Sequence, residues 1–262
     1  MNPLDDAIVN SILVHLLVSV RFLGVIFTAG VFVLPSLPVP VRFWLSVALA
    51  LVLTPVLDIG MPTLFTTAPL FLVTMLVREL IIGVAIGFFS SLPLHALQMS
   101  GYLEGTLMGF NMMNIFDPLS ETQSSVIAQV KYLLAIWFYL HWNGHMLLIQ
   151  ALSESFNLIP LSRGEWGIVV SGLPWGVWLQ SAFVLALKLS LPIFGALLLA
   201  EVGLGFVART VPQMNVFVLG IPLKIGLGLI LLLTVLPLTA DVLHEEVEKS
   251  VEAALKGAFL WR

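Results

Sequence analysis

The sequence predicts an all-α integral membrane protein, and three observations lead to this prediction. The chain has 262 residues, of which 59% are hydrophobic and 10% are charged, and its mean hydropathy is +1.06. A soluble domain is about half apolar and about a quarter charged. Several apolar runs also reach the roughly 20 residues that a helix needs to cross a bilayer. They are too long and continuous for barrel strands of about ten alternating residues, so helices are expected.

About six apolar helical segments are expected, some of them broken or re-entrant. They lie at residues 9–34, 43–59, 68–98, 126–153, 174–208 and 214–240. Prolines punctuate the first two connections, and polar stretches at 111–125 and 154–167 separate the later segments. No long linker or low-complexity tract divides the chain, so residues 1–241 are predicted to form one helical membrane domain.

The C-terminal residues 242–262 follow a different pattern. Apolar residues recur there at helical spacing, beginning with Leu243, Val247 and Val251. Glu245 and Lys249 stand four residues apart in the order that favours an ion pair along a helix. The pattern predicts an amphipathic tail helix on a membrane surface or a partner, with a solvated helix end as the alternative.

Six charged residues interrupt the apolar segments. They are Arg21, Arg78, Glu79, Lys188, Glu201 and Lys224. A charge at a helix centre in the membrane costs about 2.5–3.5 kcal/mol on insertion scales, so such residues face a bundle interior, a partner or water. Two readings stay open from the residues alone, a pore or ion path and a polar lock between helices or subunits.

Glycines recur one helical turn apart in two places. Gly101, Gly105 and Gly109 form one series, and Gly83 with Gly87 forms another. Small residues at this spacing allow helix backbones to approach closely, so these glycines are predicted to pack helices together. Glu104 lies beside the first series and is expected to meet a partner rather than lipid.

The segment 109–122, GFNMMNIFDPLSET, mixes bulky soft side chains with polar ones. Its apolar members include Phe110, Met112, Met113 and Phe116. Methionine adapts easily at contact surfaces, so such a loop could form a movable seal. Taken by itself, the segment fits an ordinary loop between helices better.

Several classes of function have poor support in the sequence. The chain has no cysteine, which excludes disulfides and thiolate metal sites, and its net charge of −4 includes no basic cluster for nucleic acid. His141 and His145 have the spacing of a zincin pair, but Trp142 occupies the position of the required glutamate. No enzyme activity, cofactor or metal site is predicted.

Several fragments together resemble one family. The fragments, in chain order, are LPSLPVPVRFWLSVALALVLTP, RELIIGVAIGF, YLEGTLMGFNMMNIFDP, WNGHMLLIQALSESFNLIPL and LLLAEVGLGFVARTVPQMNVFVLGIPLKIGLGL. They resemble the FliR family, the R subunit of the flagellar type III export gate, which is equivalent to the T subunit of virulence secretion systems. The resemblance covers nearly the whole chain in the right order, and the last fragment is its most specific part.

The resemblance implies a structural pore subunit in the bacterial inner membrane, at the flagellar basal body. Such subunits assemble with FliP-like and FliQ-like subunits as packed helical hairpins around a channel for unfolded flagellar proteins. They also cooperate with FlhB-like and FlhA-like proteins. The family's pore plug maps onto 107–122, with Phe110, Met112, Met113 and Phe116 as plug residues. Buried polar contacts between subunits are expected at Glu104, Glu201, Arg209, Gln213, Asn215 and Lys224.

Two other functions serve as alternatives. A small secondary transporter would have helices broken at Pro192 and Pro222, with Lys188 and Glu201 at a midplane site. It predicts an internal repeat, which the sequence does not reveal. A membrane-embedded metal enzyme would use His141, His145 and Glu154, and would lose activity with a chelator.

Overall fold

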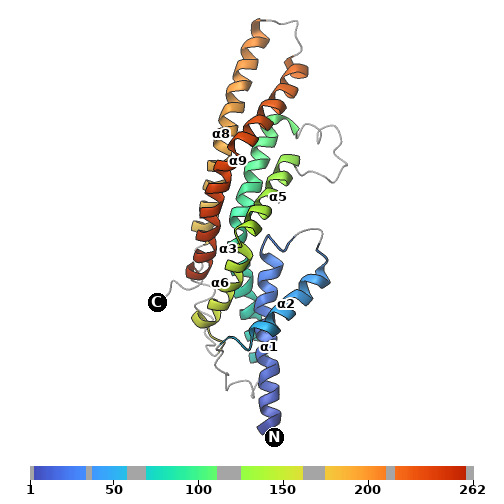
Figure 1. The fold of residues 1–262 in the computed structure, drawn as a ribbon, viewed down its shortest axis with the longest axis vertical. Coiled ribbons are helices and arrows are strands. Elements are labelled where there is room, and N and C mark those ends of the chain that lie inside the picture. The colour runs from blue at the N-terminus through green and yellow to red at the C-terminus, as the bar shows by residue number, and fades with distance from the viewer. Residues whose placement is uncertain are drawn as a thin grey trace. The chain divides into compact units, whose positions relative to one another are not determined.

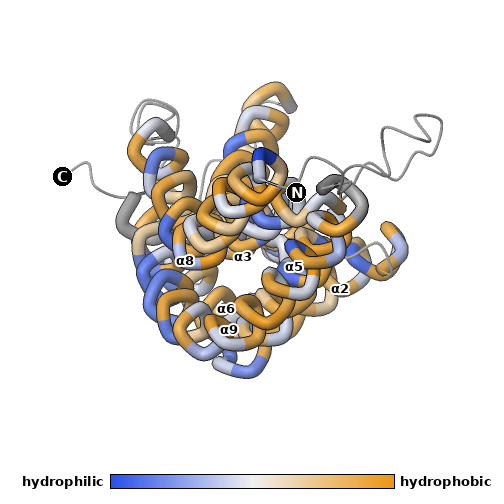
Figure 2. The backbone as a smooth tube through the Cα atoms, turned by 90° about the horizontal axis from the view of Figure 1, so that it is seen from above, coloured by the Kyte–Doolittle hydropathy of each residue, from blue (hydrophilic) through white to orange (hydrophobic). Residues whose placement is uncertain are grey.

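The structure is a computed structural model that describes residues 3–33, 37–57, 69–110, 125–161, 175–210 and 216–257. Within these ranges the chain forms α-helices and no strands, as predicted (Figure 1). The helices are α1 (Pro3–Thr28), α2 (Val39–Leu53), α3 (Pro69–Met108), α5 (Val126–His141), α6 (Gly144–Leu158), α8 (Trp175–Thr210) and α9 (Val216–Gly257). Apolar residues run along most of each helix (Figure 2).

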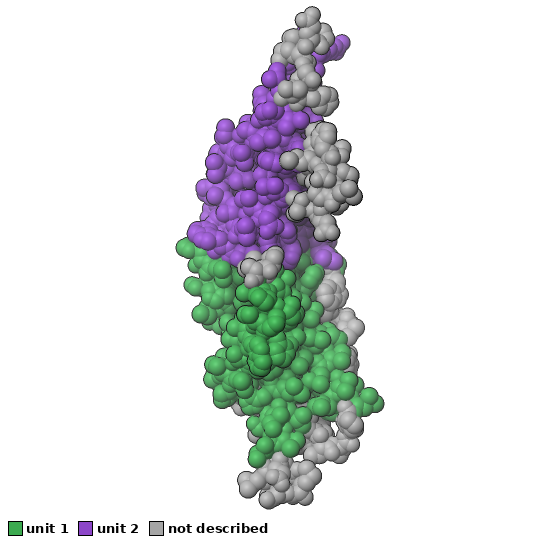
Figure 3. All heavy atoms as spheres, turned by 90° about the vertical axis from the view of Figure 1, so that its right-hand side faces the viewer, with its two compact units in different colours: residues 1–92, 139–178, 247–262 green, residues 93–138, 179–246 purple. Residues whose placement is uncertain are grey.

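The chain divides into two compact units. Unit 1 contains residues 1–92, 139–178 and 247–262, and unit 2 contains residues 93–138 and 179–246 (Figure 3). Helices α3, α5, α8 and α9 each contribute residues to both units. The predicted division at 241/242 stays a prediction, and α9 continues through that position as one helix.

In unit 1, α1 and α3 pack parallel through small residues on both helices. Gly24 of α1 lies against the backbone of Leu80 to Val84, and Thr28 of α1 lies against Gly87. The Thr28 hydroxyl donates to the carbonyl oxygen of Gly24 at 2.7 Å, which satisfies its polar group inside its own helix. Small residues one turn apart on each partner let the two backbones meet. Helix α2 packs against α1 in the same unit.

Unit 2 contains two antiparallel helix pairs. The end of α3 pairs with the start of α5, since Gly101 lies against Ala128 and Gly105 lies against Ser125. Helices α8 and α9 also pair, with Gly220 of α9 against Leu204 of α8. An apolar cluster joins the pairs, and its buried members are Met108, Ile127, Ile193, Leu197 and Leu232.

The segment 126–153, predicted as one apolar helical run, is two helices. Helix α5 ends at His141, and α6 begins at Gly144. Asn143 between them has a φ of 56°, the left-handed conformation that asparagine tolerates better than most residues. A Cβ at Gly144 would lie 2.9 Å from the Tyr139 ring and carbonyl oxygen, so only glycine fits this tight turn. The Asn-Gly pair in HWNGH is the turn signal that the apolar pattern concealed.

Proline does not end the long helices. Pro93 lies inside α3, Pro192 inside α8, and Pro222 and Pro237 inside α9. The prediction that helices are broken at Pro192 and Pro222, which the transporter alternative requires, is therefore wrong. Such prolines are tolerated in membrane helices where neighbours satisfy the freed carbonyl groups.

In the part of the chain that the structure describes, four helices are long and apolar enough to cross a membrane. They are Ile8–Thr28, Leu70–Met108, Gly176–Thr210 and Leu219–Ala253. The first has the length of one crossing, while the others have 39, 35 and 35 residues. At 1.5 Å per residue, 35 residues extend about 52 Å, which exceeds the roughly 30 Å of a bilayer's hydrocarbon core.

The C-terminal part of α9 has the predicted apolar face. Leu243, Val247 and Val251 are all buried, while Glu248 and Glu252 are exposed. The chain itself covers this face. A docking role of the tail on a membrane or a second protein stays a prediction.

Candidate functional site

Unit 2 contains a buried ion pair between α3 and α5. Lys131 donates hydrogen bonds to Glu104 Oε1 at 2.5 Å and to Ser100 Oγ at 3.0 Å. Both charged side chains are buried, because Glu104 is 0% and Lys131 is 3% exposed. Ser100 and Glu104 stand four residues apart, so they share one face of α3 and both reach the same ammonium group. Lys131 has no role in the sequence prediction, although it is the one lysine or arginine of the largely apolar helix α5.

The glycines of α3 bring the two helices close enough for this pair. A Cβ at Gly101 would lie 2.8 Å from the Cα of Ala128, and a Cβ at Gly105 would overlap the Ser125 hydroxyl. Gly101 therefore needs glycine for the backbone of α5 to approach, whereas at Gly105 a Cβ would require only that the Ser125 hydroxyl rotate away. The structure places both glycines at the contact with α5, and a packing role of these glycines, within the chain or between subunits, stays a prediction.

The predicted plug segment begins where α3 ends. Gly109 has a φ of +91°, which glycine adopts without steric cost. Phe110 follows it, is partly buried and packs against the apolar cluster of unit 2. Met112, Met113 and Phe116 lie outside the described residues. The plug role of all four stays a prediction.

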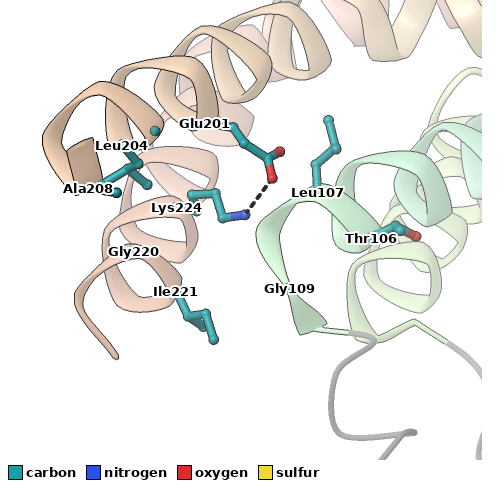
Figure 4. Close-up of a pocket in the computed structure, with 10 residues that line it drawn as sticks. Thr106, Leu107, Gly109, Glu201, Leu204, Ala208, Gly220, Ile221 and Lys224 are labelled. Atoms are coloured by element: carbon teal, nitrogen blue, oxygen red, sulfur yellow. Dashed lines mark ion pairs between the residues drawn. The ribbon is translucent and has the colours of Figure 1, made fainter. Parts of the chain in front are cut away.

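A pocket of about 470 Å³ lies beside Gly109 in unit 2. It is lined by Thr106 and Leu107 of α3, Leu204, Gly205 and Ala208 of α8, and Gly220 and Ile221 of α9, with Gly109, Glu201 and Lys224 completing it (Figure 4). The lining residues come from two of the fragments that resemble the FliR family. One is YLEGTLMGFNMMNIFDP, and the other is the last fragment, at its EVGLG and PLKI parts. Fragments about 100 residues apart in sequence therefore meet at one place.

The charged part of this pocket is the pair Glu201 and Lys224. Glu201 Oε1 lies 3.7 Å from Lys224 Nζ, and Figure 4 shows the two side chains pointing toward each other. The Glu201 side chain is 54% exposed and that of Lys224 is 17% exposed. An ion pair this open contributes little stability by itself, so the Glu201 carboxylate stays available to a further partner.

Three other predicted contact residues lie at the junction of α8 and α9. Arg209 is exposed in the last turn of α8, where a cation complements the helix dipole. Gln213 and Asn215 lie outside the described residues. The expected contacts of all three with other subunits stay predictions.

Unit 1 contains a second buried ion pair, and sequence reasoning did not identify its partners. Arg21 of α1 donates to Glu79 of α3 at 2.5 Å, to the Ser155 hydroxyl at 3.0 Å and to the Ile159 carbonyl at 3.1 Å. Its guanidinium also lies 4.0 Å from the Phe156 ring centre. One arginine thus binds α1 to α3 and α6. Arg78, adjacent to Glu79, is buried as well, with Nη1 3.9 Å from Glu79 Oε1.

The residues of the alternative functions do not assemble into sites. Lys188 is exposed, and Glu201 pairs with Lys224 of α9 instead. His141 and His145 stand on different helices, separated by the turn at Asn143. Among the described residues, no three of His, Asp, Glu or Cys gather where they could hold a metal ion.

A comparison of the sequence with models of protein families shows which family the chain belongs to. The model of the bacterial export proteins, family 1, matches residues 12–250. The chain belongs to this family.

Relatives of this export protein include both flagellar and secretion proteins. It is 31% identical to the flagellar biosynthetic protein FliR of Pectobacterium carotovorum subsp. carotovorum, over 87% of each chain. It is 32% identical to FliR of Bacillus subtilis, over 67% of this chain and 68% of the relative. It is also 30% identical to the secretion system apparatus protein SsaT of Salmonella typhimurium, over 66% of this chain and 65% of the relative. The resemblance to the FliR family and its secretion equivalents is therefore confirmed.

Family membership and the apolar helices together define the export protein at a coarse level. It is a membrane protein of an export family whose relatives are named for flagellar biosynthesis and secretion. Those names describe export rather than catalysis.

Proposed function

We propose that the chain is a structural pore subunit of the flagellar type III export gate in the bacterial inner membrane. It assembles with FliP-like and FliQ-like subunits and passes unfolded flagellar proteins. FlhB-like and FlhA-like proteins work at the same gate within the basal body. The flagellar assignment is supported by the FliR relatives at 31–32% identity, and a role in a virulence secretion system is the nearest variant of it.

The observation that supports the proposal best is the length of apolar helix left uncovered. The apolar part of α8 spans 35 residues, or about 52 Å. Even a tilt of about 40°, the upper end for membrane helices, leaves it spanning about 40 Å of depth, more than a bilayer's hydrocarbon core. Leu199 is 75% and Phe206 67% exposed near its end. Lipid cannot cover the whole helix, so other protein subunits are needed for the remainder.

Open glycines on α8 and α9 support the same conclusion. A Cβ at Gly195, Gly203, Gly205 or Gly226 would meet nothing within 4 Å. Among the described residues, nothing packs closely against these glycines, whereas Gly83 and Gly101 lie against backbone atoms of another helix. Small residues on an apolar helix are suited to close contact with another helix, which FliP-like or FliQ-like subunits would supply.

The native mass of the complex is the direct test. We expect the tagged chain, co-expressed with FliP-like and FliQ-like proteins and extracted in mild detergent, to form one large complex with a single copy of this chain. Native mass spectrometry gives the copy numbers. A stable monomer or small homo-oligomer that forms equally well in the presence of those subunits would contradict the proposal and favour the transporter alternative.

Shortening residues 110–116 should make the closed gate leak ions without preventing assembly. The physical reason is that this segment carries the bulky side chains predicted to fill the channel. Ion flux through the assembled complex in liposomes measures the leak, and native mass measures assembly. A fully assembled complex that stays as tight as the unmodified one would exclude the plug assignment.

A further inference from the structure

Within the described chain, the charged pair in the pocket of unit 2 makes no hydrogen bond. Glu201 Oε1 lies 3.7 Å from Lys224 Nζ, which is longer than a hydrogen bond between nitrogen and oxygen. Among the described residues, this is the only polar contact of either side chain. The carboxylate and the ammonium therefore both have hydrogen-bonding capacity left for a group that enters the pocket (Figure 4).

The same stretches of α8 and α9 expose large apolar side chains. Val202 and Phe206 of α8 and Leu219 and Leu223 of α9 are all more than half exposed. Apolar surface of this extent in a membrane protein is covered by lipid or by another protein. A charge that faces hydrocarbon is costly, so charges on apolar membrane helices meet protein, water or each other. The exposed carboxylate of Glu201 therefore calls for a polar partner within an apolar contact.

The walls of the pocket allow another backbone to come close. Four of the described lining residues are small, namely Gly109, Gly205, Ala208 and Gly220. A Cβ at Gly205 would meet no described atom within 4 Å, so the described chain leaves room there. Small residues on apolar helices permit close approach of a second helix. Acyl chains adapt to side chains of any size, so small walls favour a helix over a lipid as the occupant.

The pair of Glu201 and Lys224 is neutral as a whole, which restricts the side chain that such a helix can carry. An additional cation or anion would leave a net charge buried between apolar helices, which is unfavourable. A neutral group that both donates and accepts hydrogen bonds avoids this cost. The carboxamide of asparagine or glutamine has two N–H donors for the carboxylate and a carbonyl acceptor for the ammonium. Such side chains form hydrogen bonds between membrane helices.

We propose that this pocket docks an apolar helix of a neighbouring gate subunit, and that an asparagine or glutamine of that helix bridges Glu201 and Lys224. The amide N–H donates to the Glu201 carboxylate, and the Lys224 ammonium donates to the amide carbonyl oxygen. The helix itself lies against Gly205 and Ala208. This inference rests on the proposed function and deepens it, because it names the chemistry by which this subunit binds another.

A photo-crosslinker in the pocket identifies the occupant. The gate is assembled with a diazirine-bearing amino acid at Thr106, which is exposed and lines the pocket. We expect illumination to join this position to a helix of the FliP-like or FliQ-like subunit, within one turn of an asparagine or glutamine. Mass spectrometry locates the bond. Adducts only with phospholipid or only within this chain would overturn the docking, and a subunit helix without a carboxamide there would overturn the bridge.

Filling the pocket should weaken the contact between subunits without unfolding the chain. Gly205→Leu places a side chain where the described chain leaves room, and leucine favours a helix more than glycine does. We expect the Tm of the separate chain to stay the same or rise, and the neighbouring subunit to bind about tenfold more weakly because the interface is overpacked. The matched control is Gly176→Leu, at an open glycine of α8 outside the pocket. Equal subunit retention by both variants would overturn the docking.

Exchanging the two charges tests whether the occupant is neutral. Glu201→Lys alone places two ammonium groups side by side and should prevent stable binding of the neighbouring subunit. Glu201→Lys combined with Lys224→Glu restores the pair in the opposite direction, and a carboxamide can turn by about 180° to follow it. We therefore expect the exchanged pair to recover most of the subunit retention. A charged side chain could not follow the exchange, so a folded double variant that fails to bind the subunit would overturn the carboxamide bridge.

The readouts separate this inference from the proposed function. Native mass shows whether the chain assembles with FliP-like and FliQ-like subunits, and the crosslink at Thr106 shows what occupies the pocket. A complex that assembles without a subunit crosslink there would overturn the inference and leave the proposed function standing. If no such complex forms, the proposed function fails and the inference fails with it.

Discussion

Replacing Gly83 by alanine is expected to force α1 away from α3 and to destabilise unit 1 severely. The added Cβ would overlap the carbonyl oxygen of Arg21 and lie 3.1 Å from the Cα of Gly24. Both contacts are backbone atoms, which cannot rotate away as a side chain end can. Overpacking a tight interface costs about 1–3 kcal/mol and sometimes more. We expect the loss of folding free energy at Gly83 to lie at or above the upper end of this range.

Thermal unfolding of the purified chain in mild detergent measures this loss. We expect the apparent Tm to fall by about 6–12 °C, since 1 kcal/mol corresponds to about 2–4 °C in a protein of this size. The control is Gly176→Ala near the start of α8, where a Cβ would meet no described atom within 4 Å. That change should leave Tm nearly unaltered. An equal Tm for both variants would mean that α1 and α3 do not pack through Gly83.

Replacing Arg21 by methionine should have the other largest effect. Methionine leaves the Glu79 carboxylate buried without its main partner and removes the bonds to Ser155 and Ile159 of the α6 region. Breaking a buried pair by removing one partner costs about 3–5 kcal/mol. We expect a large fall in the yield of folded protein and in protease resistance of the α1, α3 and α6 segments.

A double-mutant cycle separates the charge effect from the loss of packing. Glu79→Gln combined with Arg21→Met removes the orphan charge, so it should be more stable than Arg21→Met alone. Protease resistance and Tm are measured for the unmodified chain, the two single variants and the double variant. Together they give the coupling free energy between Arg21 and Glu79. If the effects of the two changes simply add, the interaction between Arg21 and Glu79 is not the source of the stability.

Composition and periodicity were enough to predict the class of fold, because the bilayer imposes apolar helices on any chain this hydrophobic. They also pointed to glycines of α3, of which Gly83 and Gly101 lie against the backbone of another helix, while Gly109 follows the end of α3 with a positive φ. The break at Asn143 was missed because the apolar residues on either side of it continue without interruption. Pro192 and Pro222 were misread, because a proline signals a lost hydrogen bond but does not reveal whether neighbours compensate for it.

The sequence could not predict which residues the buried charges contact, for a different reason. Arg21 pairs with a residue 58 positions away and bonds to others 134 and 138 positions away. A pattern along the chain carries no information on contacts at such separations. The fragments that resemble the FliR family contain Gly109, Glu201 and Lys224, and only the structure brought these three residues together at one pocket.

The discontinuity of unit 1 has a consequence for how the protein is made. Arg21 and Glu79 leave the ribosome early, but Ser155 and Ile159 are translated about 76 residues after Glu79, which takes roughly 4–15 seconds at bacterial rates of about 5–20 residues per second. During this interval the arginine has only part of its final set of acceptors. The Arg21–Glu79 pair itself can form before α6 is synthesised, whereas the bonds to Ser155 and Ile159 can form only afterwards. Helix α6 is therefore the last of the three helices that this one arginine joins.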